Sequence, residues 1–455
     1  MKIKVSTDCV TCTVVTEGGY EMKRSVWRAE TQAPKFPELS GDVKTEVLII
    51  GGGMAGVLCA HMLKERGVDC LLCEAHSVGS GTTGRTTAVL SAQHDILYSD
   101  LIEKRGKSIA KLYLKANIDA IKKYEKLAEN IDCDFERRPS VIYSQSDGKK
   151  MLREVKALRG LGFNAGFITK MQLPIKIAGG VVFPNQAQFH PLKFLYGIAQ
   201  PLNIFCNTAV KKIDGHRAYT DKAVITADKI IIAAHFPIIN THGMFFAKLY
   251  QKRSFVIAVE NALTLDATYV DNKEGGLYFR SYKDLLIVGG GDRRTGKGCN
   301  FAPARRFIEK HFPDARIKYA WAAQDCISLD GVPYIGRYSK NLPYVYVASG
   351  FNEWGMTSSM VASELLCDMI TGKKNPYEQV FDPSRSMLHP QLFANLSETA
   401  ISLATPRGPR CTHMGCVLNY NKYEHSWDCP CHGSRFSEYG EVIDNPALSP
   451  LKPSP

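Results

Sequence analysis

The 455-residue sequence lacks long apolar runs, and no stretch reaches the roughly 18 residues needed to cross a bilayer. Its first eight residues lack the apolar core of a signal peptide. We therefore expect a cytoplasmic protein with no transmembrane segment. The formal charge of +12 is spread along the chain, without a basic stripe interleaved with aromatic residues and without a known nucleic-acid-binding motif. No nucleic-acid partner is expected.

The composition is that of a soluble globular protein, with 45% hydrophobic and 22% charged residues. This length predicts two or three domains. Most of the 14 cysteines are scattered, but four lie between Cys411 and Cys431. In a cytosolic chain, clustered cysteines indicate metal or redox chemistry more often than disulfides. The pair Cys9/Cys12 has ligand spacing but no second pair nearby, so we interpret it as incidental.

The segment 45–64 predicts a dinucleotide site. An apolar run ends in three glycines and is followed by a helical pattern. Gly51 permits a tight turn, Gly53 lets a pyrophosphate approach the backbone, and Gly56 lets the helix pack on the strand. Glu74 ends the next short strand, where a carboxylate can accept ribose hydroxyls. The alternative is a purely structural glycine turn.

Two further segments carry features of a cofactor site. Residues 79–88 are dense in glycines and hydroxyls, which suits a loop running along phosphates; a plain surface loop is the alternative. Later, the buried strand 344–350 leads through glycines into a helix to Met369. The positive end of that helix suits the partial negative charge of a reduced flavin.

The order of patterns indicates an interleaved fold. Strand 229–234 re-enters the nucleotide domain. Between about 241 and 320, short strands indicate an antiparallel sheet in a second, substrate-facing domain. The expected boundaries are an N-terminal extension at 1–44, nucleotide-domain parts at about 45–105, 189–240 and 321–380, substrate-domain parts at about 106–188 and 241–320, a linker at 381–410 and a last domain at 411–455.

On these motifs, residues 45–375 resemble the D-amino-acid oxidase-like family of FAD-dependent oxidoreductases. The resemblance implies an α/β, glutathione-reductase-like FAD domain interleaved with an antiparallel α+β substrate domain. It also implies a small amine or amino-acid-like substrate. The residues it assigns to FAD are Gly51, Gly53, Met54, Ala55, Gly56, Glu74, Thr82, Thr83, Arg85, Thr86, Val210, Gly350, Asn352, Gly355, Met356 and Thr357.

Two Cys–His pairs form the most specific pattern in the chain. One residue separates Cys411 from His413, two separate Cys429 from His432, and 15 lie between the pairs. Such pairs on facing loops can hold a two-iron cluster, although Cys₂His₂ is also a zinc set. The pattern resembles the Rieske [2Fe–2S] signature, which implies a small all-β domain.

The Rieske resemblance has three further implications. In that family a disulfide often joins the two cluster loops, which implies pairing of Cys416 with Cys431. Ser434 stands where a hydroxyl donates to a bridging sulfide. Phe436 replaces a tyrosine that donates to a ligand cysteine, so we expect a potential below the top of the Rieske range of roughly −150 to +300 mV. The interval before Cys411 is short, so the domain looks truncated.

Together these features predict an FAD-dependent dehydrogenase. It would oxidise an amine or amino-acid-like substrate and pass electrons singly through the cluster to an acceptor protein or quinone. Arg280 is a candidate clamp for a substrate carboxylate, and His190 a candidate flavin-facing residue. The alternative is an electron-transfer or redox-sensing protein without turnover. A Rieske oxygenase is disfavoured because its iron triad would need His235, at a buried strand end, with His242 and Asp228.

Overall fold

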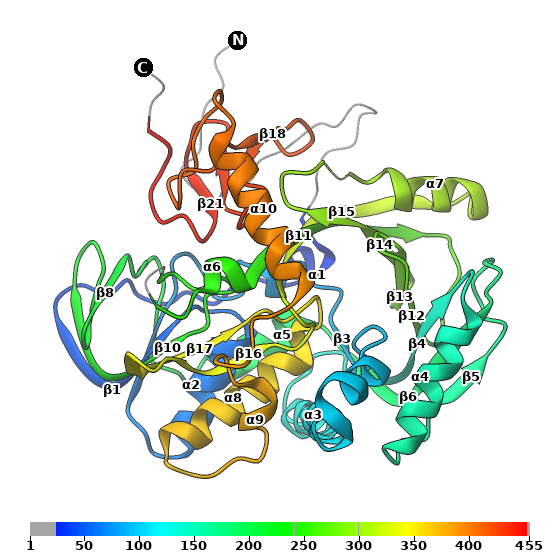
Figure 1. The fold of residues 1–455 in the computed structure, drawn as a ribbon, viewed down its shortest axis with the longest axis horizontal. Helices are drawn as coiled ribbons and strands as arrows, with labels where there is room; N and C mark the ends of the chain where they lie inside the picture. The colour runs from blue at the N-terminus through cyan, green and yellow to red at the C-terminus, as the bar shows by residue number, and fades with distance from the viewer. Residues whose placement is uncertain (1–23, 240–241, 299, 453–455) are drawn as a thin grey trace.

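The structure, a computed structural model, describes residues 24–239, 242–298 and 300–452. Its elements form three sheets (Figure 1). The Cys9/Cys12 pair lies outside the described residues. Among the helices within them, none is both long and apolar enough to span a membrane.

The first sheet, here called the parallel sheet, has eight strands in the order β16-β17-β10-β1-β2-β7, with β9 beside β10 and β8 beside β9. The pairs β1–β2, β1–β10, β10–β17 and β2–β7 are parallel. The inner half of β1 is buried on both faces, which explains its continuous apolar run. The strands are β1 (Val43–Ile50), β2 (Cys70–Cys73), β7 (Ile204–Phe205), β8 (Lys212–Asp214), β9 (Arg217–Tyr219), β10 (Val224–Ile232), β16 (Tyr334–Ser339) and β17 (Leu342–Ser349).

Helices complete this part of the molecule. Helices α2 and α8 each follow a strand of the parallel sheet through a glycine turn. The 3₁₀ turn η1 (Thr82–Arg85) lies in the segment expected to run along a cofactor. The helices here are α2 (Met54–Glu65), α5 (Pro191–Ala199), α6 (Phe245–Lys248), α8 (Gly355–Ile370) and α9 (Glu378–Phe381).

The second sheet, here called the antiparallel sheet, has nine strands in the order β15-β11-β14-β13-β12-β4-β6-β3, with β5 beside β6. One pair, β12–β4, is parallel. Its strands are β3 (Val89–Leu90), β4 (Glu136–Ser144), β5 (Gly166–Ile168), β6 (Gly179–Gln188), β11 (Leu249–Glu260), β12 (Thr268–Asp271), β13 (Leu277–Tyr282), β14 (Leu285–Arg294) and β15 (Arg316–Ser328). Its helices are α3 (Tyr98–Ala128), kinked at Gly106, α4 (Gly148–Gly160) and α7 (Ala302–His311).

The third sheet, here called the C-terminal sheet, is a four-stranded antiparallel meander above β11 and β15 (Figure 1). It comprises β18 (Asn419–Asn421), β19 (Ser426–Asp428), β20 (Arg435–Ser437) and β21 (Val442–Asp444). The segment expected as a linker contains a 15-residue helix, α10 (Pro390–Ala404). Residues 411–452 are called the cluster domain below, and residues 24–383 the flavin part.

Helix α1 (Val26–Glu30) lies in the segment expected as an extension and is packed into the core. The side chains of Val26 and Trp27 are fully buried. Trp27 donates to the carbonyl of Thr86 at 2.6 Å, and Ser25 donates to that of Gly84 at 2.5 Å. The α1 segment therefore holds the glycine- and hydroxyl-rich loop by two side-chain hydrogen bonds to its main chain.

Candidate cofactor and substrate sites

The glycine turn after β1 has the geometry of a phosphate site. Gly51 has φ +113°, and a Cβ on it would lie 2.5 Å from the carbonyl oxygen of Ala233. A Cβ on Gly56 would lie 1.9 Å from the carbonyl oxygen of Gly51. A Cβ on Gly53, by contrast, would lie no closer than 3.4 Å to another atom, the Thr83 hydroxyl oxygen. Helix α2 begins at Met54 without a side-chain cap from Gly53, and its N-terminus, where the positive end of the helix dipole lies, suits a phosphate.

Glu74 and Thr83 lie beside this turn. Glu74 accepts from the amide of Gly52 at 2.6 Å, and Thr83 Oγ1 accepts from the amide of Met54 at 3.0 Å. Thr82 donates to the carbonyl of Gln324 at 2.9 Å. The loop is thus held between the start of α2 and strand β15, as a cofactor-binding segment requires.

The second glycine–helix junction comes at the end of β17. Gly350 has φ +70°, and Asn352 and Glu353 are also left-handed, at φ +53° and +71°. The carbonyl of the Asn352 side chain accepts from Ser328 N at 2.8 Å. Helix α8 then starts without a side-chain cap. Non-glycine residues in this conformation are uncommon and cluster at functional sites.

The remaining predicted flavin residues make contacts within the protein. Thr357 donates to the carbonyl of Ser91 at 3.1 Å, and Met356 accepts from Tyr124 at 2.8 Å through its own carbonyl. Val210 is buried in a hydrophobic cluster with residues of β1 and β10. Arg85 forms an ion pair with Asp444 of the cluster domain at 3.8 Å. No ligand contact tests these assignments, which stay predictions.

Both predicted catalytic residues are buried. Arg280 is 1% exposed, and its Nη1 donates to the carbonyls of Thr87, at 2.5 Å, and Ala88, at 2.9 Å. His190 caps α5 by accepting from the amide of Lys193 at 3.2 Å. Burial lowers the pKa of Arg280 to about 9 and that of His190 to about 4. The Arg280 bonds hold the end of the cofactor loop, and the clamp and flavin-facing roles stay predictions.

A group of carboxylates that the motifs did not reveal surrounds Lys252. Its Nζ lies 3.2 Å from Asp292 Oδ2, and Asp325 is its direct partner across β11 and β15. Glu353 and Asp95 are charged neighbours of the same group. We call these five residues the carboxylate cluster. They come from β11, β14, β15, the turn before α8 and the segment after β3, so no local pattern joins them.

The carboxylate cluster is partly enclosed by protein and partly open to solvent. Asp95 and Glu353 are exposed, and both are left-handed, at φ +50° and +71°. Desolvation by the surrounding protein raises the pKa of Asp325, which is half-buried, to about 7. It also raises the pKa of Glu353 well above its ordinary value although that side chain keeps solvent-exposed surface, and Asp292 adds to both shifts. Burial alone would lower the pKa of Lys252, but Glu353 and Asp292 raise it above its ordinary value. Four carboxyl groups share one lysine and raise one another's pKa values, so a cation that enters the site would favour their charged forms.

In the cluster domain the two predicted ligand loops face each other. The imidazole rings of His413 and His432 lie 4.9 Å apart between centroids, at 84°. The thiols of Cys411 and Cys429 are neighbours. Both ring nitrogens of His432 are buried and have no hydrogen-bond partner among the described residues. Two thiols and two imidazoles on facing loops, with orphaned imidazole nitrogens, fit a Rieske cluster.

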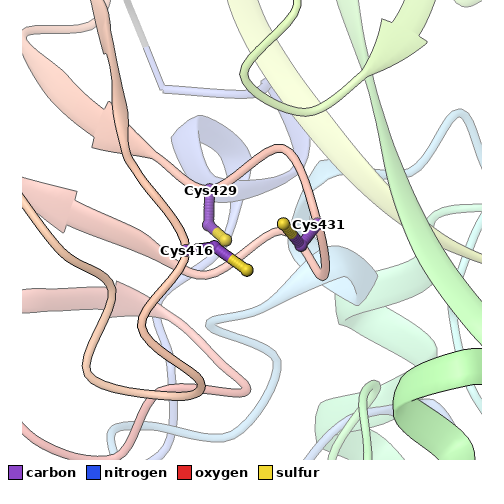
Figure 2. Close-up of side chains that lie close together, drawn as sticks. All are labelled: Cys416, Cys429 and Cys431. Carbon is purple, nitrogen blue, oxygen red and sulfur yellow. The ribbon is translucent and has the colours of Figure 1, made fainter. Parts of the chain in front are cut away.

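The second cysteine pair is also placed between these loops. The sulfur atoms of Cys416, Cys429 and Cys431 lie within 4.8 Å of one another (Figure 2). Cys416 and Cys431 are free thiols here, so the expected disulfide is not shown and stays a prediction. Ser434 accepts from Ala447 N at 3.0 Å, and Phe436 is fully buried. Within the described ranges this is the one close trio of metal-ligating side chains, and it does not include His235, His242 or Asp228.

Comparison with known proteins identifies both parts of the chain. The family model for FAD-dependent oxidoreductases (DAO) matches residues 46–369, and that for the Rieske [2Fe–2S] domain matches residues 407–455. The chain belongs to the DAO family of FAD-dependent oxidoreductases. This family member is an enzyme that uses FAD, and its C-terminal Rieske domain carries a [2Fe–2S] cluster. The expected fold is confirmed.

Individual relatives agree. Over 496 residues, the oxidoreductase is 32% identical to the putative Rieske 2Fe-2S iron-sulfur protein YhfW of Bacillus subtilis, covering 95% of this chain and 97% of that one. It is 25% identical to gamma-glutamylputrescine oxidoreductase of Escherichia coli, covering 77% and 89%. Its fold is similar to that of glycine oxidase from Geobacillus kaustophilus, with TM-score 0.65, 20% identity and coverage of 76% and 99%.

Proposed function

We propose that this oxidoreductase is a dehydrogenase for a small amine or amino-acid-like substrate, and that it passes the electrons one at a time through the Rieske cluster to an acceptor protein or quinone. The observation that carries the proposal is the carboxylate cluster beside the start of α8. A substrate with an ammonium group would stabilise the charged forms of these carboxyl groups. The similarity to gamma-glutamylputrescine oxidoreductase supports an amine substrate.

Among amines and amino acids, the charges favour a substrate whose cationic end carries no carboxylate. Asp95, Asp292, Asp325 and Glu353 would repel a carboxylate, and Lys252 is already paired with Asp292 at 3.2 Å. Arg280, the candidate clamp, donates to main-chain carbonyls instead. We therefore propose an amine or diamine in preference to an α-amino acid.

Bound FAD supplies the acceptor for the hydride of the substrate. In the overall change, a C–N single bond becomes a C=N double bond and the substrate loses two electrons and two protons. We propose that Asp325 takes the ammonium proton, because a base with a pKa near the working pH is the most effective and its pKa is raised to about 7. The two electrons then pass to two equivalents of a one-electron acceptor or to one quinone.

A matched pair of compounds tests the substrate class. Purified holoprotein is titrated anaerobically with 1,4-diaminobutane and with ornithine, which differs from it by one carboxylate. We expect the flavin absorbance to bleach with the diamine at lower concentration than with ornithine. Equal bleaching by both, or bleaching by ornithine alone, would refute the preference for a carboxylate-free amine.

The second candidate function is an electron-transfer or redox-sensing protein without turnover of its own. The buried contact between the cluster domain and the flavin part favours it, because electron exchange needs no small substrate there. Broad screening of amines and amino acids distinguishes the two functions. Bleaching by none of them, with full reduction by dithionite, would establish the second function in place of the first.

A further inference from the structure

The second cluster loop is covered by the antiparallel sheet. All nine residues from 428 to 436 are buried. Gln251 of β11 donates to the carbonyl of His432 at 2.8 Å, and Gln324 of β15 donates to that of Gly433 at 2.9 Å. Arg294 of β14 donates to the carbonyl of Cys431 at 2.9 Å. Three neighbouring strands thus hold the main chain of this loop.

The histidine side of the cluster site also meets the parallel sheet. The ring of Phe236 is edge-on to both imidazoles, at centroid distances of 6.2 Å to His413 and 6.1 Å to His432. Phe236 follows β10, whose last residues border the glycine turn. Asn445 of the cluster domain donates to the carbonyls of Ala234, at 2.5 Å, and Phe236, at 2.8 Å. The short segment from the end of β10 to Phe236 therefore links the glycine turn to the imidazoles, and Asn445 holds it by two hydrogen bonds.

A buried ionic network joins the same surfaces. Arg253 of β11 binds Glu424 of the cluster domain through two charge-assisted bonds, and their side chains are 3% and 4% exposed. Arg435 pairs with Glu424 at 3.1 Å and with Asp444 at 3.0 Å. With Asp428 and Arg85, the network has three arginines and three carboxylates. Separating the domains would leave opposite charges unpaired on the two surfaces, which is strongly unfavourable.

We infer that the histidine side of the cluster is a permanent internal contact, locked by Arg253 as a positioning residue, across which the flavin part and the cluster exchange electrons within one chain. It follows that an external one-electron acceptor or quinone reaches the cluster from the first loop, where residues 412–415, His413 among them, are only half-buried. The inference rests on the proposed function for the source of the electrons. The contact itself is a property of this chain's own residues.

Cutting the chain between the two parts tests the contact. The segment 405–408 is exposed, so a specific protease site can be inserted between Arg407 and Gly408. After cleavage of the holoprotein, we expect the C-terminal fragment to co-elute with the flavin part on size exclusion, carrying its Rieske EPR signal. Separation of a cluster-containing fragment from the otherwise native protein would overturn the inference.

The variant Arg253→Gln tests whether this arginine holds the cut fragment in place. Removing one partner of a buried pair should make the cut fragment dissociate about a hundredfold more readily. Arg293→Gln is the control, because Arg293 is the exposed neighbour opposite Arg253 on β14. Equal retention of the fragment in both variants would refute the lock. If Arg253→Gln does not fold, Asn445→Ala removes two bonds at the same contact and is scored by the same criterion.

A kinetic readout separates positioning from structural support and needs no amine. The flavin of uncut protein is reduced by light in the presence of EDTA, and cluster reduction is followed by absorbance and EPR. We expect the rate to be unchanged over about a tenfold range of protein concentration, as for an intramolecular process. In Arg253→Gln, with FAD and iron content unchanged, the rate should fall at least about tenfold, with partial rescue in Arg253→Lys. A concentration-dependent rate in the unaltered protein, or an unchanged rate in Arg253→Gln, would refute the inference even if amine turnover is established.

Discussion

Replacing Asp325 by asparagine should remove the pH dependence of amine binding. Burial raises the pKa of Asp325 to about 7, with Asp292 raising it further and Lys252 lowering it. Glu353 and Asp95, both with raised pKa values, are the other charged groups of the carboxylate cluster. Below pH 7 the carboxyl is protonated and neutral, and above it is an anion. An alkylammonium ion, with a pKa near that of lysine at about 10.4, stays charged throughout this range.

The magnitude follows from the charge that the carboxyl gains. If the anion is the form that binds the amine, the Kd should rise about tenfold for each pH unit below 7 and level off above it. A hydrogen bond to a charged group contributes about 1.5–3 kcal/mol, so Asp325→Asn should weaken amine binding about 10- to 150-fold at pH 8. At pH 5.5, where the native carboxyl is already neutral, the two proteins should differ much less.

The assay is anaerobic titration with 1,4-diaminobutane, with flavin absorbance as the signal, at half-unit steps from pH 5.5 to pH 8.5. Asp314→Asn serves as the control, because Asp314 is an exposed acid just before β15. The control should reproduce the native profile. A native profile that is flat across pH 7, or an Asp325→Asn profile that keeps the native slope, would refute the assignment of Asp325 as the proton-accepting group.

Three further predictions concern the cofactor sites. Phe436→Tyr should restore a hydroxyl donor near the cluster and raise its potential by about 20–60 mV, measured by protein-film voltammetry, if one net hydrogen bond favours the reduced form; a lower potential would contradict this reason. Gly56→Ala should abolish FAD retention or folding, since its Cβ would lie 1.9 Å from the carbonyl oxygen of Gly51, whereas Gly67→Ala, with no neighbour within 4 Å but a positive φ, should cost stability alone. Mass analysis of unreduced protein should show Cys416 joined to Cys431, and loss of the pairing in Cys416→Ser should leave iron bound but less firmly; two free thiols in the native holoprotein would rule the pairing out.

The two cofactor motifs could be predicted because each is local in sequence. The glycine turn needs one strand, one helix and a fixed spacing, and the cluster needs two short Cys–His loops. The strand alternation of the second sheet is equally local. For these features, the residues that carry the chemistry are also the residues that shape the backbone.

The carboxylate cluster and the ionic network depend on contacts across long sequence separations. Arg253 and Glu424 are 171 residues apart, and each alone is an ordinary charged residue in a strand or turn. Lys252 and Asp325 meet through the register of β11 with β15, which no local pattern specifies. Helix α1 escaped prediction for a related reason: five residues are too few for a periodic signal, and the helix is stabilised by burial of Trp27 against a loop about sixty positions later.

Because of helix α1, the folded catalytic unit includes residues that precede the first strand, β1. Alignment of the family begins at residue 46, yet the side chains beneath the cofactor loop begin at Ser25. A truncated protein that begins at β1 would expose to solvent the side of that loop that α1 covers. It would also lose the buried apolar contacts of Val26 and Trp27. Recombinant versions meant to isolate the catalytic unit should therefore retain the residues ahead of the first strand, and affinity tags belong at a distance from them.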